Sequence, residues 1–364
     1  MQEQYLGVSF LLCTYNGATR LAETLACLAA QSVPAGIAWE IIFVDNASTD
    51  GSAELACDSW TALGSPAPLR QLHELRPGYK MAMQRAIEQV AYRYACIVDD
   101  DNRLDADYLR TAVNLMETHP HIGILGGPNT ASFEGSAPAW FSVFQHCYAS
   151  GPQLNRVGGS FAPLVDGPVG RNVLWGAGMF VRAEVWRQLH AHGFTSLFTG
   201  RQGEANLTAG EDDELCYAAQ LLSYQVWYST RLHLRHHIAA NRLTETYRDR
   251  LVYASARSAI RLNAYRNTLW GRSDGTPGAN LLKDVLYAVL SIAKGVCQPA
   301  FVRACLTNNR LVLMSIRNEL VVVQEMVLHR RRVKAYYEQV LRFKQRLRSS
   351  LSFSATASTT ECTD

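Results

Sequence analysis

The sequence lacks three features that define secreted or membrane-spanning proteins. Its nine cysteines include no Cys-x-x-Cys pair, and an odd, scattered set in a chain of 364 residues is typical of reduced thiols. No run of about 18 apolar residues is free of charge, so we expect no membrane-spanning helix. The start, Met1-Gln2-Glu3-Gln4, does not resemble a signal peptide. Together these absences favour a cytoplasmic protein.

The net charge is small, +3, but it is unevenly distributed. From residue 274 to the end there are 13 Lys and Arg against 7 Asp and Glu, and eight of these basic residues lie between Arg330 and Arg348. Few aromatic side chains accompany this run, so nucleic acid is not the expected partner. A basic amphipathic segment can instead lie on an anionic membrane surface, or it can be an ordinary helical cap with a solvated face.

Strand patterns alternate with helical patterns over the first hundred residues. Apolar runs at 6–12, 39–44, 69–72 and 95–98 each end in a polar loop. Between them, apolar spacing predicts a helix to about Gln31 and another from about residue 79 toward Tyr94. This alternation predicts a doubly wound α/β fold with a parallel sheet, in which the polar loops meet at one edge.

The remaining chain divides into less regular and helical parts. Residues 126–173 are rich in Gly, Pro, Ser and aromatic residues, and we expect long loops with one or two helices there. Short strands are expected at 226–228 and 232–236, and helices beyond Thr244. We therefore expect an α/β domain over 1–250, with halves 1–102 and 103–250, a helical basic amphipathic extension over 251–348, and a disordered tail over 349–364.

Three consecutive carboxylates, Asp99-Asp100-Asp101, directly follow the buried run at 95–98. Adjacent carboxylates repel, and burying them is costly unless a cation or hydrogen-bond donors lie among them. Mg²⁺ and Mn²⁺ prefer oxygen ligands, often one or two carboxylates together with substrate phosphates. The alternative interpretation is a solvated acidic turn at the start of a helix.

Five blocks in this order resemble the family 2 glycosyltransferases, which have the GT-A fold and use nucleotide-sugar donors. The resemblance covers roughly residues 6–250. The blocks are Cys13-Thr14-Tyr15-Asn16, Val44 to Ser52, Asp99-Asp100-Asp101, Gly176-Ala177-Gly178 and Glu211-Asp212. The resemblance implies a GT-A domain whose first half binds nucleotide and whose second half binds acceptor.

The resemblance implies a nucleotide site at the first strand ends. Thr14, Tyr15 and Asn16 would line the base and ribose, and Asp45 would accept a hydrogen bond from an imide N–H such as that of uracil. Core or hinge packing is the alternative for Tyr15. We expect largely structural roles for Asn46 and Asp50, which lie in the same block.

Further donor contacts are implied by two later blocks. Gly78 and Lys80 open a helix that would meet phosphate or base, although Lys80 can equally be a solvated lysine. In the D-x-D motif, Asp101 would bind Mn²⁺ or Mg²⁺, and Asp99 or Asp100 would approach the ribose or the metal. The metal would stabilise the departing nucleoside diphosphate.

His236 occupies the position at which the family often has a histidine that contacts the metal. His237 is adjacent, and alternation along a strand would point the two side chains to opposite faces. A satisfied surface pair is the alternative. Arg242 could clamp phosphate, but we favour a surface arginine.

Asp212 is the expected general base, which removes the proton of the acceptor hydroxyl. An aspartate, with an ordinary pKa of about 3.9, is already ionised at neutral pH. A helix N-cap is the alternative role. A single base without a second nucleophile implies direct displacement and inversion at the anomeric carbon. A wall for acceptor or donor sugar is expected from Trp175, Gly176, Ala177, Gly178 and Glu211, with tight packing as the alternative for the glycines.

The sequence therefore predicts an inverting, metal-dependent glycosyltransferase acting on a nucleoside-diphosphate sugar, with UDP favoured. The resemblance implies a glycan or lipid-linked acceptor in bacterial surface-polysaccharide synthesis, with a cytoplasmic location, at most peripheral on the inner face of the membrane. One alternative is a sugar nucleotidyltransferase, which would have no use for Asp212. The other is a non-catalytic GT-A scaffold, which would not need to keep Asp45, Asp101 and Asp212.

Overall fold

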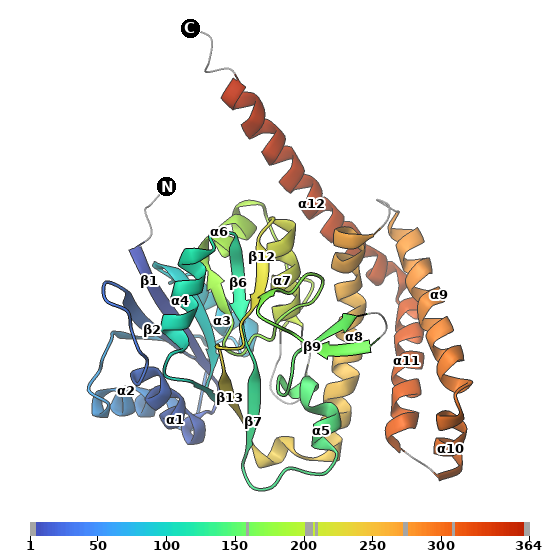
Figure 1. The fold of residues 1–364 in the computed structure, drawn as a ribbon, viewed down its shortest axis with the longest axis horizontal. Helices are drawn as coiled ribbons and strands as arrows, with labels where there is room; N and C mark the ends of the chain where they lie inside the picture. The colour runs from blue at the N-terminus through green and yellow to red at the C-terminus, as the bar shows by residue number, and fades with distance from the viewer. Residues whose placement is uncertain are drawn as a thin grey trace. The chain divides into compact units, whose positions relative to one another are not determined.

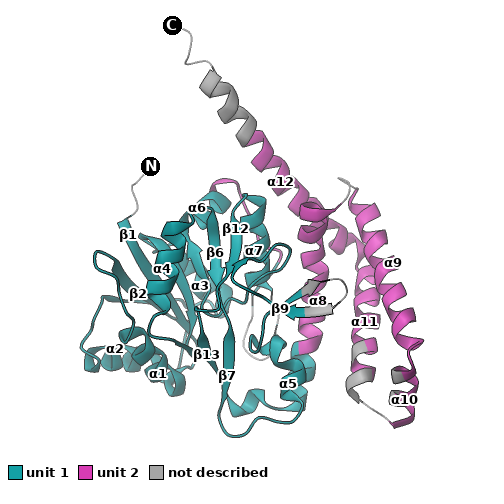
Figure 2. Cartoon of the chain, in the orientation of Figure 1, with its two compact units in different colours: residues 1–190, 198–251 teal, residues 191–197, 252–364 magenta. Residues whose placement is uncertain are grey.

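A computed structural model describes residues 5–157, 160–200, 207, 210–271, 276–307 and 310–359 (Figure 1). The chain forms two compact units (Figure 2). Unit 1 comprises residues 1–190 and 198–251, and unit 2 comprises residues 191–197 and 252–364. The boundary between them falls inside helix α8 (Glu245–Trp270).

Unit 1 is built on an eight-stranded mixed sheet in the order β10-β12-β6-β11-β4-β1-β2-β3. Its strands are β1 (Tyr5–Thr14), β2 (Ala38–Asp45), β3 (Leu69–His73), β4 (Tyr92–Asp99), β6 (Ile122–Gly126), β10 (Gly167–Pro168), β11 (Phe180–Arg182) and β12 (Gln225–Tyr228). The four N-terminal strands are parallel, as predicted, whereas β11 runs antiparallel between β4 and β6. The carboxyl ends of β1, β2, β3 and β4 therefore lie at one edge of the sheet.

Helices cover both faces of this sheet because alternate strand residues point to opposite sides. Val8, Phe10 and Leu12 join one core cluster with apolar residues of α1 (Ala18–Ala29), α2 (Ser52–Ala62) and α4 (Tyr108–Thr118). Leu11 has the opposite parity and is also fully buried, and α3 (Tyr79–Ile87) packs against β1 and β2. Helices α6 (Ala183–Ala191) and α7 (Glu211–Leu221) complete the helical layers.

A second, three-stranded sheet lies beside the acidic triplet, in the order β5-β13-β7. Its strands are β5 (Asn102–Leu104), β7 (Asn129–Phe133) and β13 (Leu234–Ile238). The intervening segments are α5 (Phe141–Phe144), η1 (Gln145–Tyr148), the hairpin β8 (Leu154–Val157) and β9 (Ser160–Pro163), and η2 (Ala240–Arg242). Residues 126–173 thus contain four short strands where long loops were predicted.

Another expectation was wrong at the end of α3. The helix ends at Ile87 rather than near Tyr94, and β4 begins at Tyr92. Valine and tyrosine favour strands, and the run from Val90 to Tyr94 continues directly into the buried residues of β4.

Unit 2 is helical, as predicted for the C-terminal region. Its helices are the later part of α8, α9 (Pro277–Val296), α10 (Pro299–Thr307), α11 (Arg310–Leu328) and α12 (Arg330–Thr359). Helix α12 buries a stripe of apolar residues at intervals of three and four: Val333, Tyr337, Val340, Phe343 and Leu347. Helix α12 extends to Thr359, into the segment 349–364 for which a disordered tail was predicted, and residues 360–364 lie outside the described part.

No single helix among the described residues is long and apolar enough to cross a membrane. Helices α9 and α10 pass such a test only as a pair, on length and composition, and they are bent by 67° relative to each other.

Candidate functional site

The ends of three neighbouring strands bring the first predicted blocks together. In the parallel register, Thr14 of β1 pairs with Asp45 of β2, and Cys13 pairs with Asp99 of β4. Buried apolar runs therefore deliver a threonine and two carboxylates to the same edge of the sheet, where α/β proteins bind their ligands.

Asp45 is buried at this edge, and its Oδ1 accepts a hydrogen bond from the Ser48 amide at 3.2 Å. His73, at the end of β3, places Nδ1 3.4 Å from Asp45 Oδ2. Asn16 has a left-handed backbone with φ of 49°, and its Oδ1 accepts from the Thr49 amide at 2.8 Å. The side chain of Asn16 thus ties the first two strand-end loops together, while Tyr15 is 54% exposed beside them.

Asn46 connects the second strand end to the start of α3. Its Nδ2 donates to the carbonyls of Glu74 and Arg76, and its Oδ1 accepts from the Gly78 amide at 2.8 Å. The Gly78 N–H that was expected to meet a ligand is therefore used within the protein. Lys80 Nζ donates to the carbonyl of Phe198 at 2.7 Å, and the half-buried ammonium has further N–H donors, so its contact with phosphate stays a prediction.

Asp100 points into the protein rather than toward a ligand. Its carboxylate receives two hydrogen bonds from Arg20, at 3.0 and 2.9 Å, and one from Thr14 Oγ1 at 2.6 Å. Its carbonyl accepts from Thr24 Oγ1 at 2.9 Å. These contacts anchor the loop and use the Thr14 hydroxyl as a donor, whereas the nucleotide contact of Asp100 stays a prediction.

Asp101 faces the second sheet. His236 Nε2 lies 3.4 Å from Asp101 Oδ1, and Arg242 Nη1 lies 3.1 Å from Oδ2. Burial alone would raise the pKa of Asp101, but the charges and hydrogen bonds of His236 and Arg242 outweigh it and hold the pKa well below its ordinary value. Strand β13 places His236 next to Asp101, whereas His237 contributes its backbone amide to the Asp101 carbonyl.

Arg242 was predicted to be a surface arginine, and that prediction is wrong. Its side chain is 18% exposed and lies near the rings of Tyr148 and Tyr247, at 6.0 and 5.7 Å from their centroids. Arg242 follows β13 of the second sheet, and this sheet places it beside Asp101. The two residues are 141 positions apart in the sequence, so their contact could not be predicted from the sequence.

Among the described residues, no group of three or more His, Cys, Asp or Glu side chains is arranged to hold a metal ion. Asp101 and His236 form a pair of one carboxylate oxygen donor and one imidazole nitrogen donor. The buried His236 Nδ1 has no hydrogen-bond partner within the described residues.

Asp212 stands at the start of α7 and contacts the predicted sugar wall. Its Oδ2 accepts a hydrogen bond from the Gly176 amide at 2.8 Å, and its Oδ1 accepts from the Asp213 amide at 3.0 Å. The wall is in turn bonded to β4, because the Gly178 amide donates to the Ile97 carbonyl at 3.0 Å. Asp212 of α7 is therefore hydrogen-bonded to the segment 176–178, which is itself bonded to β4 just before the acidic triplet.

The other residues of the predicted sugar wall differ in how far they are buried. Trp175 and Gly176 are half-buried, and Glu211 is half-buried at the first turn of α7. Ala177 is buried. Gly178 has φ of 74°, and an added Cβ would lie 2.5 Å from the Tyr108 hydroxyl and from Leu234. Gly178 thus allows close packing, which was the alternative to a sugar contact.

Tyr79, which the sequence analysis did not select, lies among these groups. Burial raises its pKa strongly, and the neighbouring charges of Asp99, Cys13 and Asp212 raise it further, in that order. The same phenol is thus near enough to sense the charges of both carboxylate blocks. The feature of the sequence that could have pointed to Tyr79 is its position directly after Gly78, in the first turn of α3.

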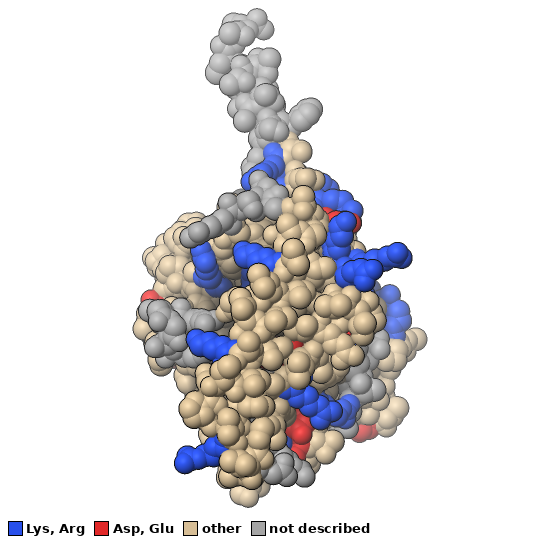
Figure 3. All heavy atoms as spheres, turned by 90° about the vertical axis from the view of Figure 1, so that its right-hand side faces the viewer, with Lys and Arg blue, Asp and Glu red and all other residues tan. Residues whose placement is uncertain are grey.

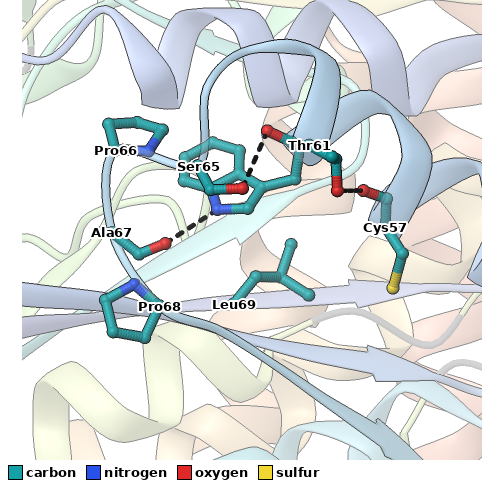
Figure 4. Close-up of a pocket in the computed structure, with 8 residues that line it drawn as sticks. Cys57, Thr61, Ser65, Pro66, Ala67, Pro68 and Leu69 are labelled. Carbon is teal, nitrogen blue, oxygen red and sulfur yellow. Dashed lines mark hydrogen bonds between the residues drawn. The ribbon is translucent and has the colours of Figure 1, made fainter.

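A pocket of about 550 Å³ lies elsewhere, between α2 and the segment leading to β3 (Figure 4). Trp60 Nε1 donates to the Ala67 carbonyl at 2.8 Å, and Thr61 Oγ1 donates to the Cys57 carbonyl at 2.9 Å (Figure 4). None of the predicted site residues lines it, and its polar groups serve the turn between the two elements.

Comparison with known proteins identifies the family. The model of glycosyl transferase family 2 matches residues 9–161, and that of glycosyl transferase family group 2 matches residues 95–266. The chain belongs to the family 2 glycosyltransferases, and the predicted enzyme class is confirmed at this level.

A curated relative is the poly-beta-1,6-N-acetyl-D-glucosamine synthase of Staphylococcus epidermidis. It is 26% identical over 132 residues, which make up 34% of this chain and 29% of the relative. The matched region thus spans less than a third of that protein's length.

Solved structures extend the comparison to the fold. The mannosyltransferase PcManGT from Pyrobaculum calidifontis, solved with GDP-Man and Mn²⁺, has a TM-score of 0.53 at 15% identity over 90% of this chain and 88% of that chain. TarS 1-349 of S. aureus, solved with UDP, has a TM-score of 0.46 at 16% identity over 89% of this chain and 92% of that chain. The predicted GT-A fold followed by a helical C-terminal region is confirmed.

Proposed function

We propose that this chain is an inverting, metal-dependent glycosyltransferase that moves a sugar from a nucleoside diphosphate, preferably UDP, to a hydroxyl group. The observation that carries the proposal is the hydrogen bond from the Gly176 amide to Asp212 Oδ2. Gly176 belongs to the segment that pairs with β4, so the candidate base is tied to the strand that ends in the acidic triplet. A nucleotidyltransferase would have no role for a carboxylate held there.

The donor nucleotide is proposed to bind at the ends of β1, β2 and β4. Asp45 is buried yet keeps its Oδ2 toward the exposed ring of His73, so a base with an N–H group could reach this oxygen. Tyr15, exposed on the adjacent loop, would cover the base or ribose. Asp99 would approach the ribose, since Asp100 is committed to Arg20.

Asp101 and His236 are the proposed protein ligands of a divalent cation. One carboxylate oxygen and one imidazole nitrogen suit Mn²⁺ better than Mg²⁺, which prefers oxygen ligands only. When bound, the cation would supply positive charge to the leaving diphosphate. Two protein ligands would leave coordination positions for diphosphate oxygens and water, and this fits the absence of a three-residue metal cluster in the described part of the chain.

Asp212 is the proposed general base. The acceptor hydroxyl gives its proton to Asp212 as its oxygen forms a bond to the anomeric carbon, and the bond from that carbon to the diphosphate oxygen breaks on the opposite side. The electron pair of that bond leaves with the diphosphate. Both Asp212 oxygens accept backbone N–H bonds, which fixes the orientation of the carboxylate.

The acceptor is proposed to be a glycan or a lipid-linked sugar, in the synthesis of a surface polysaccharide. The support is the matched segment of a poly-beta-1,6-N-acetyl-D-glucosamine synthase, which covers 34% of this chain. The half-buried Trp175, next to Gly176, offers a flat apolar surface on which a sugar ring could stack.

Release of UDP from UDP-sugars in water tests the base, since water is a hydroxyl acceptor that uses the same group. Asp212→Asn should lower the rate by at least about 100-fold while leaving UDP affinity unchanged. Asp213→Asn, at the neighbouring position of the same helix turn, is the matched control and should retain most activity. Equal rates for the wild type and Asp212→Asn would rule out this role for Asp212.

A further inference from the structure

The helices of unit 2 expose an apolar face that nothing in the described part of the unit covers. On α9 the residues Leu282, Leu286 and Leu290 are 70%, 57% and 59% exposed. On α10, Val302 and Leu306 are 57% and 82% exposed. We call these five residues, together with the 45% exposed Val289, the outer apolar face.

The outer apolar face is not the face that packs the unit together. The opposite side of α9 contains the buried Ala288 and Asp284, whose carboxylate accepts hydrogen bonds from Asn267 and Tyr337. The half-buried Leu281, Val285 and Ile292 lie on that same inner side, so α9 is largely apolar on both sides, although a helix that covers a core needs only one apolar side. The second apolar side requires another explanation.

The charges around the outer apolar face have one sign. Every charged side chain described as exposed on α9, α10 and α11 is basic, and the four are Lys283, Lys294, Arg303 and Arg317. The acidic residues of these helices are partly buried and paired inside the unit: Asp284 with Tyr337, Glu319 with Ser291, and Glu325 with Arg257. Figure 3 looks onto this side of the molecule and shows a largely uncharged surface with more blue than red side chains.

We propose that the outer apolar face docks on an anionic phospholipid membrane, with α9 and α10 lying in the interface. Apolar side chains would enter the boundary of the acyl chains while the basic groups stay among the lipid phosphates. Helices α9 and α10 are bent by 67° relative to each other, and each carries residues of the outer apolar face. This inference is independent of the proposed catalytic residues, all of which lie in unit 1.

The structure moves the docking surface away from the basic run of α12, where the sequence suggested it. The apolar stripe of α12 is already buried within unit 2, with Tyr337 and Phe343 only 0% and 3% exposed. Lys344 of the basic run donates its Nζ hydrogen to the Thr268 carbonyl at 2.7 Å. Over the part of α12 whose side chains are described, up to residue 350, the apolar stripe is thus already used, and the outward arginines would add only electrostatic attraction.

Vesicle flotation of the full chain tests the proposal. Vesicles of phosphatidylcholine alone are compared with vesicles of phosphatidylcholine and phosphatidylglycerol in equimolar amounts. We expect flotation with the anionic vesicles only, weakened by salt. Val302→Glu should weaken vesicle binding at least tenfold, because it would bring a negative charge to the boundary of the acyl chains. Lys294→Gln should weaken it about fivefold, which corresponds to about 1 kcal/mol per basic residue.

Val165→Glu is the matched control, because Val165 is a 77% exposed valine of unit 1. It should float like the wild type. Calorimetric UDP binding, measured on every variant, separates this inference from the proposed function. A wild-type protein that binds UDP but does not float with anionic vesicles would overturn membrane docking and leave the proposed function intact. If the wild type does not float but forms a dimer, and Val302→Glu abolishes that dimer, the membrane proposal is overturned. The outer apolar face would then be a contact between two copies of the chain.

Discussion

The Arg242 guanidinium lies 3.1 Å from the Asp101 carboxylate, and both side chains are largely buried. The pair joins the acidic triplet after β4 to the segment after β13, 141 residues further along the chain. Asp101 is also the proposed metal ligand. The same carboxylate therefore pairs with Arg242 in the structure and would bind the cation during the reaction.

Arg242→Met should destabilise unit 1, because it leaves the Asp101 carboxylate with only His236 and the Asn102 amide, which donates to Oδ1 at 3.0 Å. Removing one member of a buried ion pair is costly, and with these two partners remaining we expect a loss of about 2 kcal/mol. Urea unfolding measures this change. Arg235→Met, on an exposed position of β13, is the matched control and should change stability by less than about 0.5 kcal/mol.

His236→Ala should raise the Mn²⁺ concentration needed for UDP binding by about tenfold or more. His237→Ala provides the control, since His237 is adjacent on the same strand but only its backbone contacts Asp101. Titration of Mn²⁺ at fixed UDP distinguishes them. Equal effects of the two substitutions would argue against His236 as a ligand.

Gly17→Ala should destabilise the loop after β1. An added Cβ would lie 2.2 Å from both Asp100 Oδ2 and Thr14 Oγ1, so the buried hydrogen bond between these groups would have to break. We expect a loss of about 2–3 kcal/mol in urea unfolding. Gly278→Ala is the control: nothing lies within 4 Å of its added Cβ, and a helical alanine should be neutral or slightly stabilising.

Glu74 should make stability depend on acidity. Hydrogen bonds from the Arg76 side chain and amide lower the pKa of Glu74 to about 2. Because the folded-state pKa is depressed, the stabilisation is complete above the ordinary pKa of about 4.3 and is lost as the pH falls toward the folded value. The difference in urea midpoint between wild type and Glu74→Gln should therefore shrink from about pH 6 to about pH 3. A difference that stays constant would contradict this linkage.

The strand ends could be predicted from the sequence because each ends a buried apolar run abruptly with polar residues. Thr14, Asp45 and Asp99 mark the last residues of β1, β2 and β4. Parallel neighbours must then place them at one edge. Asp212 was selected by the resemblance of Glu211-Asp212 to a family block, and it lies in the first turn of α7, where four acidic residues begin the helix.

The orientation of individual side chains could not be predicted in this way. Nothing local distinguishes Asp100, which turns toward Arg20, from Asp101, which turns toward Arg242. The choice depends on partners far away in sequence. Tyr79 was missed for a similar reason, since only the fold brings α3 close to Asp212. The strands between 126 and 173 were missed because they are short and lack a regular alternation of apolar and polar residues.

The most direct test of the account is calorimetric titration with UDP, GDP and dTDP, each with and without Mn²⁺, of the wild type and Asp101→Ala. The account predicts that UDP binds in the presence of Mn²⁺, that binding weakens without the metal, and that Asp101→Ala abolishes the metal-dependent part. A folded wild-type protein that binds none of the three diphosphates would contradict the account and favour a non-catalytic scaffold.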